Sequence, residues 1–225
     1  MALIELKSVT KIYPLGSQEV VAVDDFSLSI EAGEFSVLAG PSGSGKTTLL
    51  NLIGCLDQPT SGEIWLDGRE VGHADQKTLS ELRLRKIGFI FQAYNLIPVL
   101  TAAENAEFTL MLQRVGKKQR RERVLQLFSV LGLDGLENRK PSDLSGGQQQ
   151  RVAIARAMAS EPAVILADEP TASLDSHASE ELLALMQRLN EEQGATFIFS
   201  SHDPLVISHA KRVVRLQDGH LESDQ

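Results

Sequence analysis

Hydrophobic and polar positions follow a strand-like pattern near the N-terminus and a helical pattern through the middle of the chain. Short apolar stretches bounded by turn residues predict strands over 3–6, 26–30 and 35–39, and the segment 61–68 predicts a turn, a strand and a second turn. From Thr78 helical spacing predominates, interrupted by the apolar run 87–91. After Ser145 helices over 147–159 and 176–192 alternate with strands over 164–167, 196–200 and 213–216. Strands separated by helices indicate right-handed parallel crossovers, so the sequence predicts an α/β core.

Composition narrows the class of protein further. The chain has 225 residues with 22 basic and 30 acidic side chains, a formal net charge of −8, and at roughly 150 residues per domain it predicts one domain, 1–225. Nucleic acid is not an expected partner, because binding it depends on basic side chains that neutralise phosphates. The single cysteine, Cys55, excludes an intramolecular disulfide or a cysteine-based zinc site and is expected to be buried. The single cysteine and an N-terminus without a basic start and apolar core indicate a cytoplasmic protein. No apolar run approaches the roughly 18 residues of a membrane span, so we do not expect the chain to cross a membrane by itself.

A glycine-rich loop provides the first chemical motif. Residues 40–47 match the phosphate-binding pattern GxxxxGK(S/T), follow a predicted strand and open the helix 47–53. Backbone N–H groups and the helix N-terminus would hold phosphate oxygens, Lys46 would neutralise the β- and γ-phosphates, and Thr47 would bind Mg²⁺. The alternative is a surface turn rich in glycine and serine. The predicted nucleotide-binding residues are Gly40, Pro41, Ser42, Gly43, Ser44, Gly45, Lys46, Thr47 and Thr48.

Two adjacent acids end the apolar strand 164–167. Ligands of open α/β sheets bind at the carboxyl ends of the strands, which would place Asp168 and Glu169 beside a bound phosphate. Asp168 would hold Mg²⁺ through water, since this ion keeps several waters and takes few carboxylates. Glu169 would polarise the attacking water. A solvated turn explains the pair equally well when it is considered without the phosphate loop.

A second Ser/Gly loop opens the helix 147–159 about 100 residues after the first loop. Its helix N-terminus would bind an anion, but the loop has no lysine. One nucleotide site needs one phosphate loop, so this second loop is expected to close over the γ-phosphate held by another copy of the chain, in a two-fold dimer. The alternative is an ordinary helix start capped by Ser145. The loop consists of Leu144, Ser145, Gly146, Gly147 and Gln148.

These motifs together resemble one family. The phosphate loop, the LSGGQ pentapeptide, the ADEP strand end and His202 occur in the order found in ATP-binding-cassette (ABC) ATPases, over nearly the whole chain. The resemblance implies ATP hydrolysis with Mg²⁺ as cofactor. It also implies a P-loop NTPase core with an N-terminal antiparallel β subdomain and an inserted helical subdomain at about 92–160.

The resemblance implies further site residues. Tyr13 would stack on adenine, although a strand-end tyrosine can also simply pack on the sheet. Gln92 would touch Mg²⁺ and the lytic water and relay the state of the site to a membrane partner. His202 would contact the γ-phosphate. The alternative is a structural role, which is the more usual one for a solitary histidine. The D-loop at the dimer seam would be Ser173, Leu174 and Asp175.

The segments FQAYNLIPVLTAAEN, LSGGQQQRVAIARAMA and ILADEPTASLD are similar to the lipoprotein-releasing, macrolide-exporting and FtsE-type cell-division ATPases. That group commonly has Gly-Asn at the positions of Ala172 and Ser173. The similarity implies an ATP-dependent homodimer on the inner face of the cell membrane, bound to a permease. The alternative functions are a nucleotide-timed mechanical clamp without transport, and a soluble ABC protein of DNA repair or translation. The latter usually has a coiled-coil insertion or two fused cassettes.

Two further segments have expected surface roles. The basic cluster, residues 117–123, predicts a solvated helix face, with an anionic membrane surface as the alternative. The docking segment, residues 92–100, is apolar with few charges and follows the predicted γ-phosphate sensor Gln92. It is therefore expected to contact the membrane partner, although core packing accounts for part of its apolar character.

Overall fold

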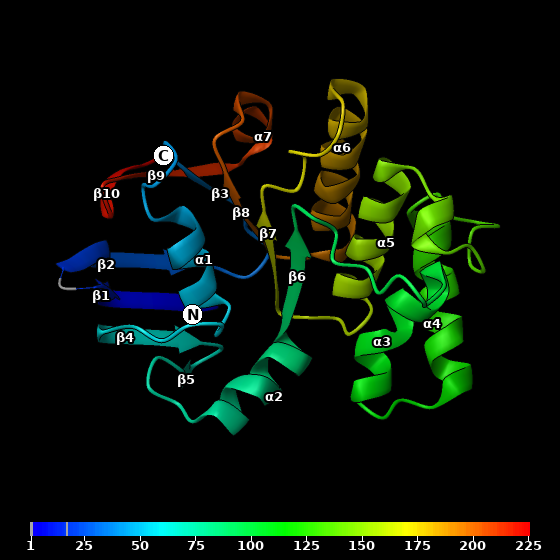
Figure 1. The fold of residues 1–225 in the computed structure, drawn as a ribbon, viewed down its shortest axis with the longest axis horizontal. Helices are drawn as coiled ribbons and strands as arrows, with labels where there is room; N and C mark the ends of the chain where they lie inside the picture. The colour runs from blue at the N-terminus through cyan, green and yellow to red at the C-terminus, as the bar shows by residue number, and fades with distance from the viewer. Residues whose placement is uncertain (1, 17) are drawn as a thin grey trace.

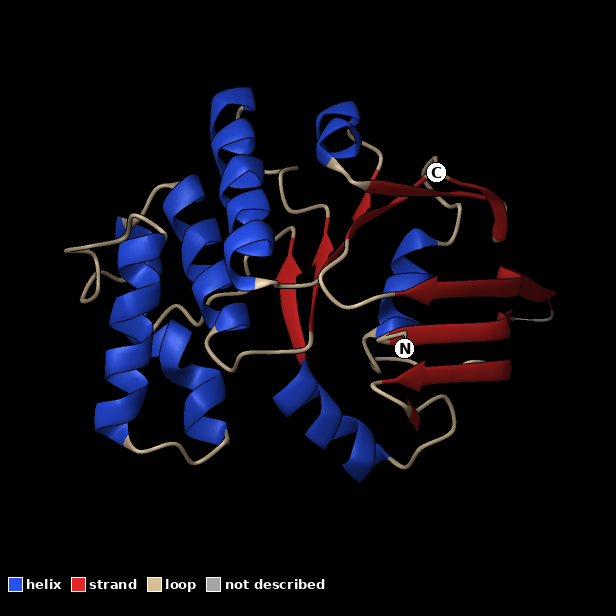
Figure 2. Cartoon of the chain, turned by 180° about the vertical axis from the view of Figure 1, so that it is seen from behind, coloured by secondary structure: helices blue, strands red, loops and turns tan. Residues whose placement is uncertain are grey.

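Two β-sheets organise the chain in the computed structural model, which describes residues 2–16 and 18–225. The smaller sheet is antiparallel, with the order β2-β1-β4-β5 (Figures 1 and 2). Its strands are β1 (Ile4–Leu15), β2 (Gln18–Ile30), β4 (Ser61–Leu66) and β5 (Arg69–Glu70). This sheet confirms the predicted N-terminal antiparallel unit.

The larger sheet has the order β10-β9-β3-β8-β7-β6. Its strands are β3 (Phe35–Ala39), β6 (Ile87–Phe91), β7 (Val164–Asp168), β8 (Phe197–Ser201), β9 (Arg212–Gln217) and β10 (His220–Asp224). Every neighbouring pair is parallel except the β9–β10 hairpin. The predicted α/β core is therefore confirmed.

Strand alternation lets the larger sheet bury side chains on both of its faces. On β3, Val37 and Ala39 lie in the hydrophobic core beneath the helices, whereas Leu38 lies in the core shared with the antiparallel sheet. On β8, Phe199 and Ile198 divide between the two cores in the same way. Successive side chains of a strand point to opposite faces, so the uninterrupted apolar runs of the sequence are what a sheet covered on both sides requires.

The helices cover the two faces of the larger sheet. Helix α1 (Lys46–Ile53) contacts strands of both sheets and lies between them, while α2 (Gln76–Lys86) leads directly into β6 (Figure 1). Helices α3 (Ala102–Leu112), α4 (Lys117–Val130) and α5 (Gly146–Met158) pack on one another, and the 3₁₀ turn η1 (Pro141–Asp143) precedes α5. Helices α6 (Ser176–Gln193) and α7 (Pro204–His209) complete the fold.

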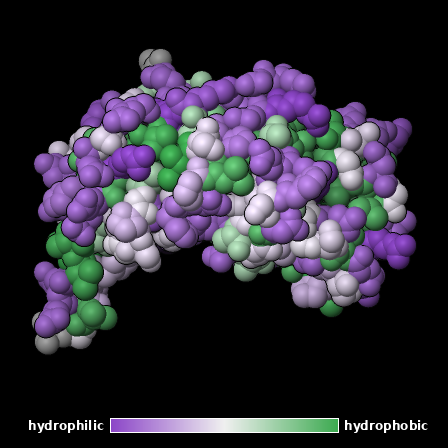
Figure 3. Space-filling view, turned by 90° about the horizontal axis from the view of Figure 1, so that it is seen from above, coloured by the Kyte–Doolittle hydropathy of each residue, from purple (hydrophilic) through white to green (hydrophobic). Residues whose placement is uncertain are grey.

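Strands β1 and β2 extend far beyond the segments that the sequence predicts. The pairing of β1 with β4 ends at Thr10, whereas its pairing with β2 continues to Leu15. This free end of the hairpin exposes Leu15, Val20 and Val21, and it projects as an arm at the lower left of Figure 3. Helix α7 was also not predicted, because it has only six residues and its signal is limited to Asp203 as N-cap and Pro204 in the first turn.

The basic cluster is only partly the solvated face that the sequence predicts. Lys118 is solvated, with 91% of its side chain exposed, but the Arg120 side chain is 17% exposed and pairs with Glu107. Arg121 also contacts Glu107, and Arg123 pairs with Glu161. Sequence spacing could not reveal these pairs, because Glu107 lies on α3 and reaches the cluster only when α3 packs against α4.

Candidate active site

Four parallel strands end side by side and carry most of the predicted site residues. The register pairs Ala39 of β3 with Ser201 of β8, and Asp168 of β7 with both Ser200 of β8 and Phe91 of β6. The segments that follow these strand ends are therefore neighbours. They are the phosphate loop after β3, His202 after β8, Asp168 with Glu169 at the end of β7, and Gln92 after β6.

The phosphate loop adopts a conformation that depends on its glycines. Gly45 has φ +100°, and a Cβ atom there would lie 2.3 Å from the carbonyl oxygen of Ala22. Gly40 is similarly confined, since a Cβ atom would lie 2.3 Å from the carbonyl oxygen of Leu216. The pattern GxxxxGK(S/T) thus specifies positions that no other residue type can occupy without moving the backbone.

Lys46 is folded back into the loop. It is 6% exposed, and its Nζ donates to the carbonyl oxygens of Gly40 and Pro41 at 2.8 and 2.9 Å. Burial lowers the pKa of Lys46, and the nearby carboxylates of Glu169 and Asp168 oppose that shift. Next to it, the Thr47 hydroxyl donates to Asp168 Oδ1 at 3.3 Å, which joins the loop to the end of β7.

Glu169 is held by the last residue of β8 and by the residue that follows this strand. Its Oε2 accepts from the Ser201 hydroxyl at 2.7 Å, and its Oε1 lies 2.6 Å from His202 Nδ1. The Glu169 side chain is 18% exposed and that of His202 is 69% exposed. The carboxylate is thus fixed in orientation while the histidine ring remains accessible.

Tyr13 lies on the β1–β2 hairpin next to the loop that follows α1. Its hydroxyl donates to Asp57 Oδ2 at 2.7 Å, and Lys11 Nζ lies 4.8 Å from its ring centroid. Burial and the neighbouring Asp57 raise the pKa of Tyr13. Burial would raise the pKa of Asp57 as well, but hydrogen bonds from Lys11, Tyr13 and the Gln58 backbone lower it below its usual value.

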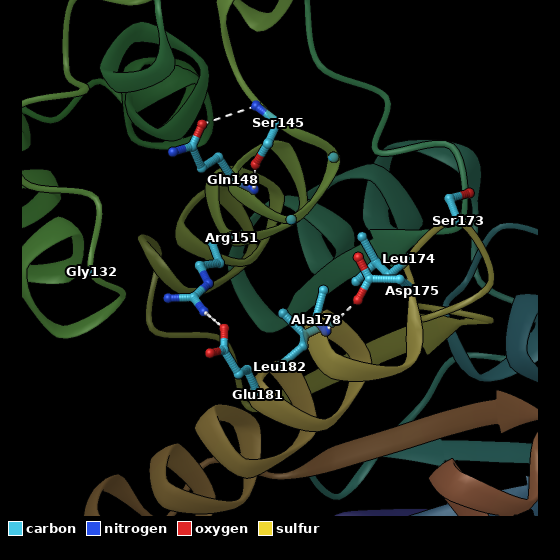
Figure 4. Close-up of a pocket in the computed structure, with 12 residues that line it drawn as sticks. Gly132, Ser145, Gln148, Arg151, Ser173, Leu174, Asp175, Ala178, Glu181 and Leu182 are labelled. Carbon is cyan, nitrogen blue, oxygen red and sulfur yellow. Dashed lines mark hydrogen bonds and ion pairs between the residues drawn. The ribbon is translucent and has the colours of Figure 1, made fainter.

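The LSGGQ segment forms a capped helix start that lines a separate cleft. Ser145 Oγ accepts from the Gln148 backbone N–H, and Gln148 Oε1 accepts from the Ser145 N–H at 2.9 Å, a reciprocal capping box (Figure 4). The cleft has a volume of about 470 Å³. Its lining comes from the LSGGQ segment, the predicted D-loop and helix α6, together with Gly132 and with Arg151 of α5, which pairs with Glu181 (Figure 4). Among the described residues, none of the phosphate loop lines it.

The segment after β6 touches both the D-loop and the LSGGQ loop. The carbonyl oxygen of Gln92 accepts from the Ser173 hydroxyl at 3.3 Å, and the Tyr94 hydroxyl lies 3.5 Å from the Ser173 carbonyl oxygen. A Cβ atom added at Gly146 would lie 2.9 Å from the same Tyr94 hydroxyl. Arg156 of α5 donates to the carbonyl oxygens of Tyr94 and Asn95. Three loops far apart in the sequence therefore meet within one subunit.

Sequence reasoning missed several residues of this arrangement. Ser201, Arg156 and Asp57 each touch a predicted site residue or its loop, but none belongs to a motif with fixed spacing. Tyr94 was predicted as part of the docking segment, but its contact with Ser173 was not. The position of Ser201 directly before His202 was the one signal available for this group, because a serine at a strand end can hold a neighbouring acid.

The same combination of motifs and fold is found in known proteins. A family model described as ABC transporter matches residues 23–172, and the chain belongs to this family. An ABC transporter ATP-binding protein of Methanocaldococcus jannaschii is 46% identical over 227 residues, covering 99% of this chain and 97% of that protein. A solved dimeric structure of that archaeal cassette, in a post-hydrolysis state bound to ADP and Pi, matches with a TM-score of 0.90 at 45% identity. It covers 99% of this chain and 97% of that one.

Another group of relatives is longer. The macrolide export ATP-binding/permease protein MacB of Photorhabdus laumondii is 47% identical over 223 residues, covering 99% of this chain but 34% of that protein. The chain thus spans about a third of these relatives. Within the described residues, no helix has the length and apolar character needed to cross a membrane. The comparisons confirm the predicted ABC ATPase fold and the resemblance to the macrolide-exporting group.

Proposed function

We propose that this chain is the ATP-hydrolysing subunit of an export-type ABC transporter, which dimerises on ATP and drives a membrane permease. The observation that carries the proposal is the alignment of four strand ends, which gathers the phosphate loop, two acids, Gln92 and His202 at one edge of the sheet. Phosphoryl transfer requires positioning and electrostatic stabilisation more than covalent chemistry, and this edge offers both.

In this proposal the phosphate loop and Lys46 bind the β- and γ-phosphates, and Tyr13 stacks on adenine. Lys46 exchanges its two carbonyl acceptors for phosphate oxygens when ATP binds. Glu169, oriented by Ser201 and His202, accepts a proton from the attacking water. His202 and Gln92 contact the γ-phosphate end of the site, with Thr48 supporting the phosphates from the first turn of α1.

The oxygen donors of this edge fit Mg²⁺. Thr47 Oγ1 and Asp168 Oδ1 lie 3.3 Å apart, and both are the hard ligands that this ion takes in small number. Thr47 would hold the ion directly and Asp168 through water, with Gln92 beside them. Bound Mg²⁺ would neutralise charge that develops on the β- and γ-oxygens.

The LSGGQ cleft supports a composite site between two subunits. It presents a helix N-terminus to solvent, and its lining includes Ser173, Leu174 and Asp175 of the D-loop but, within the part of the chain that the structure describes, nothing from the phosphate loop. In a two-fold dimer each such cleft faces the ATP of the other copy, which completes two sites with one interface. The archaeal cassette with this fold is dimeric.

We infer a permease partner from the MacB relatives, in which an ATP-binding part and a permease share one chain. These relatives favour transport over the mechanical-clamp alternative. The helical subdomain, residues 92–160, would receive the partner through the docking segment, where Val99 is 75% exposed. The chain would then lie on the inner face of the cell membrane, held there by the permease.

Two measurements test this proposal. ATP turnover and ATP affinity are measured for the wild type, Lys46→Ala and the exposed-lysine control Lys77→Ala, and we expect loss of both only at Lys46. Undiminished affinity in Lys46→Ala would contradict the phosphate-loop assignment. A photo-crosslinker at Val99, in membranes that contain the permease, should label that protein, whereas the same group at Glu222 on β10 should not. Labelling at Glu222 alone would exclude the docking segment as the contact.

A further inference from the structure

Lys11, Tyr13 and Asp57 form a closed set of contacts that no sequence motif indicates. The Asp57 carboxylate accepts from the Tyr13 hydroxyl and from Lys11 Nζ, each at 2.7 Å, through different oxygens. Lys11 Nζ also donates to the Gln58 carbonyl oxygen at 2.8 Å and lies 4.8 Å from the centroid of the Tyr13 ring. The Lys11 side chain is 13% exposed, so its charge is largely withdrawn from solvent.

These contacts attach Tyr13 to the helix that carries the phosphate loop. Asp57 follows α1, and the backbone N–H groups of Leu56 and Asp57 both donate to the carbonyl oxygen of Asn51, at 2.9 and 3.3 Å. The Tyr13 ring is therefore fixed relative to the C-terminal end of α1, although Tyr13 lies on the antiparallel sheet and α1 follows a strand of the larger sheet.

We propose that Lys11 and Asp57 are positioning residues that set the Tyr13 ring at a fixed place relative to the phosphate loop, and thereby determine affinity for the nucleotide base. This inference rests on the proposed stacking of Tyr13 on adenine. Lys11 occupies one face of the ring and leaves the opposite face for a purine. The tether through the hydroxyl limits ring rotation, so stacking orders few additional degrees of freedom.

The size of the effect follows from the contacts. A cation over an aromatic ring raises affinity by about a few-fold, and a hydrogen bond of ordinary strength raises it by about twofold to tenfold. These factors use the conversion of roughly 1.4 kcal/mol for each tenfold change in affinity. Loss of either tether should weaken binding of ATP by about threefold to tenfold, and loss of the ring itself should weaken it more.

The test uses the full chain and two probes. Affinities are measured for the nonhydrolysable ATP analogue adenylyl imidodiphosphate and for magnesium tripolyphosphate, which has the phosphates but no base. Lys11→Met and Asp57→Ala should each weaken binding of the ATP analogue and leave tripolyphosphate unchanged. Asp57→Asn should recover part of the loss, because its amide oxygen still accepts from Tyr13. In turnover assays KM for ATP should rise while kcat stays constant.

Lys7→Met is the matched control, since Lys7 also lies on β1 over an aromatic ring, 5.3 Å from the centroid of Trp65, and should have no effect. Equal weakening of tripolyphosphate would overturn the inference, because the tethers would then act on the phosphate loop. Wild-type affinity of Lys11→Met and Asp57→Ala, with weakening in Tyr13→Ala, would overturn it and leave adenine stacking intact. Wild-type affinity of Tyr13→Ala would overturn the stacking and the inference together, while continued ATP turnover would leave the proposed ATPase function standing.

Discussion

Replacing Glu169 by glutamine separates catalysis from dimerisation within one residue. The amide keeps the size of the side chain and one acceptor oxygen, but it has no carboxylate to accept a proton. In the structure both carboxylate oxygens are engaged, by the Ser201 hydroxyl at 2.7 Å and by His202 Nδ1 at 2.6 Å. The Ser201 oxygen already accepts from the Asp203 N–H at 3.1 Å. In the Glu169→Gln variant the Ser201 hydroxyl can therefore still donate its proton to the carbonyl oxygen of the new amide.

The magnitude follows from these contacts. Replacing a hydrogen bond to a charged acceptor with one to a neutral acceptor costs about 1 kcal/mol. Glu169→Gln should therefore fold with a small loss of stability. Loss of a general base slows a reaction by about 10²- to 10⁴-fold, which is roughly 3 to 5 kcal/mol in the barrier. The same change removes a negative charge near the proposed γ-phosphate position, so ATP trapped between two subunits should be repelled less.

The assay combines ATP turnover with gel filtration. Glu169→Gln should hydrolyse ATP about 10²- to 10⁴-fold more slowly than the wild type, elute as a monomer with MgADP, and elute at twice that mass with ATP. The exposed Glu81→Gln on α2 is the matched control and should behave as the wild type. Turnover of Glu169→Gln at the wild-type rate would refute the role of its carboxylate. A chain that stays monomeric with saturating ATP would refute the composite site between two subunits.

Three further predictions concern Gly146, Asn105 and Cys55. Gly146→Ala should lower the thermal midpoint, and adding Tyr94→Phe should restore it by removing the hydroxyl that the new Cβ meets at 2.9 Å. Turnover should stay low in the double variant, because the methyl group still covers the surface proposed for the partner's ATP. Asn105 is fully buried and its side chain bonds Ile97, Leu100 and Thr101, so Asn105→Ala should lower the free energy of unfolding by about 1–3 kcal/mol in urea. Burial raises the pKa of the Cys55 thiol to about 11, above the ordinary 9.0. The folded state therefore holds the thiol proton more tightly than the unfolded state does. The contribution of this proton to stability is complete below about pH 9 and is lost as the pH rises toward 11, which urea unfolding at several pH values would measure. Because the thiol is buried, its alkylation at pH 8 should proceed only as fast as the protein unfolds.

The sequence was informative wherever a motif directly follows a strand. Apolar runs predicted β3, β7 and β8 and marked the position of β6, and the carboxyl-edge rule then placed Asp168 and Glu169 beside the phosphate loop. Gln92 and His202 were predicted from the resemblance to ABC ATPases. Neighbouring parallel strands in this register leave little freedom for the residues that follow them. For this reason the location of the site could be predicted without knowledge of any side-chain contact.

Contacts between loops could not be predicted in the same way. The approach of Tyr94 to Ser173 joins positions 79 residues apart, and that of Tyr13 to Asp57 joins positions 44 apart. Neither pair has a periodicity or a fixed spacing, because each depends on how two irregular segments fold against each other. The exposed ends of β1 and β2 were missed for a related reason, since their hydrophobic side chains face solvent and break the strand pattern.

Backbone strain occurs at two of the strand ends that carry the proposed chemistry, as it does at several turns elsewhere in the described residues. Tyr94 and Asn95, after β6, have φ of 53° and 50°, and Glu169, after β7, has φ of 45°. A left-handed conformation costs a non-glycine residue roughly 1–2 kcal/mol, so neighbouring groups must hold it. Arg156 binds the carbonyl oxygens of the first two residues, and the Glu169 N–H donates to the Ser200 carbonyl oxygen at 2.9 Å. The loops after β6 and β7 are thus held in position by the groups around them, which is what a site needs if Gln92 and Glu169 are to meet one phosphate group from two different strands.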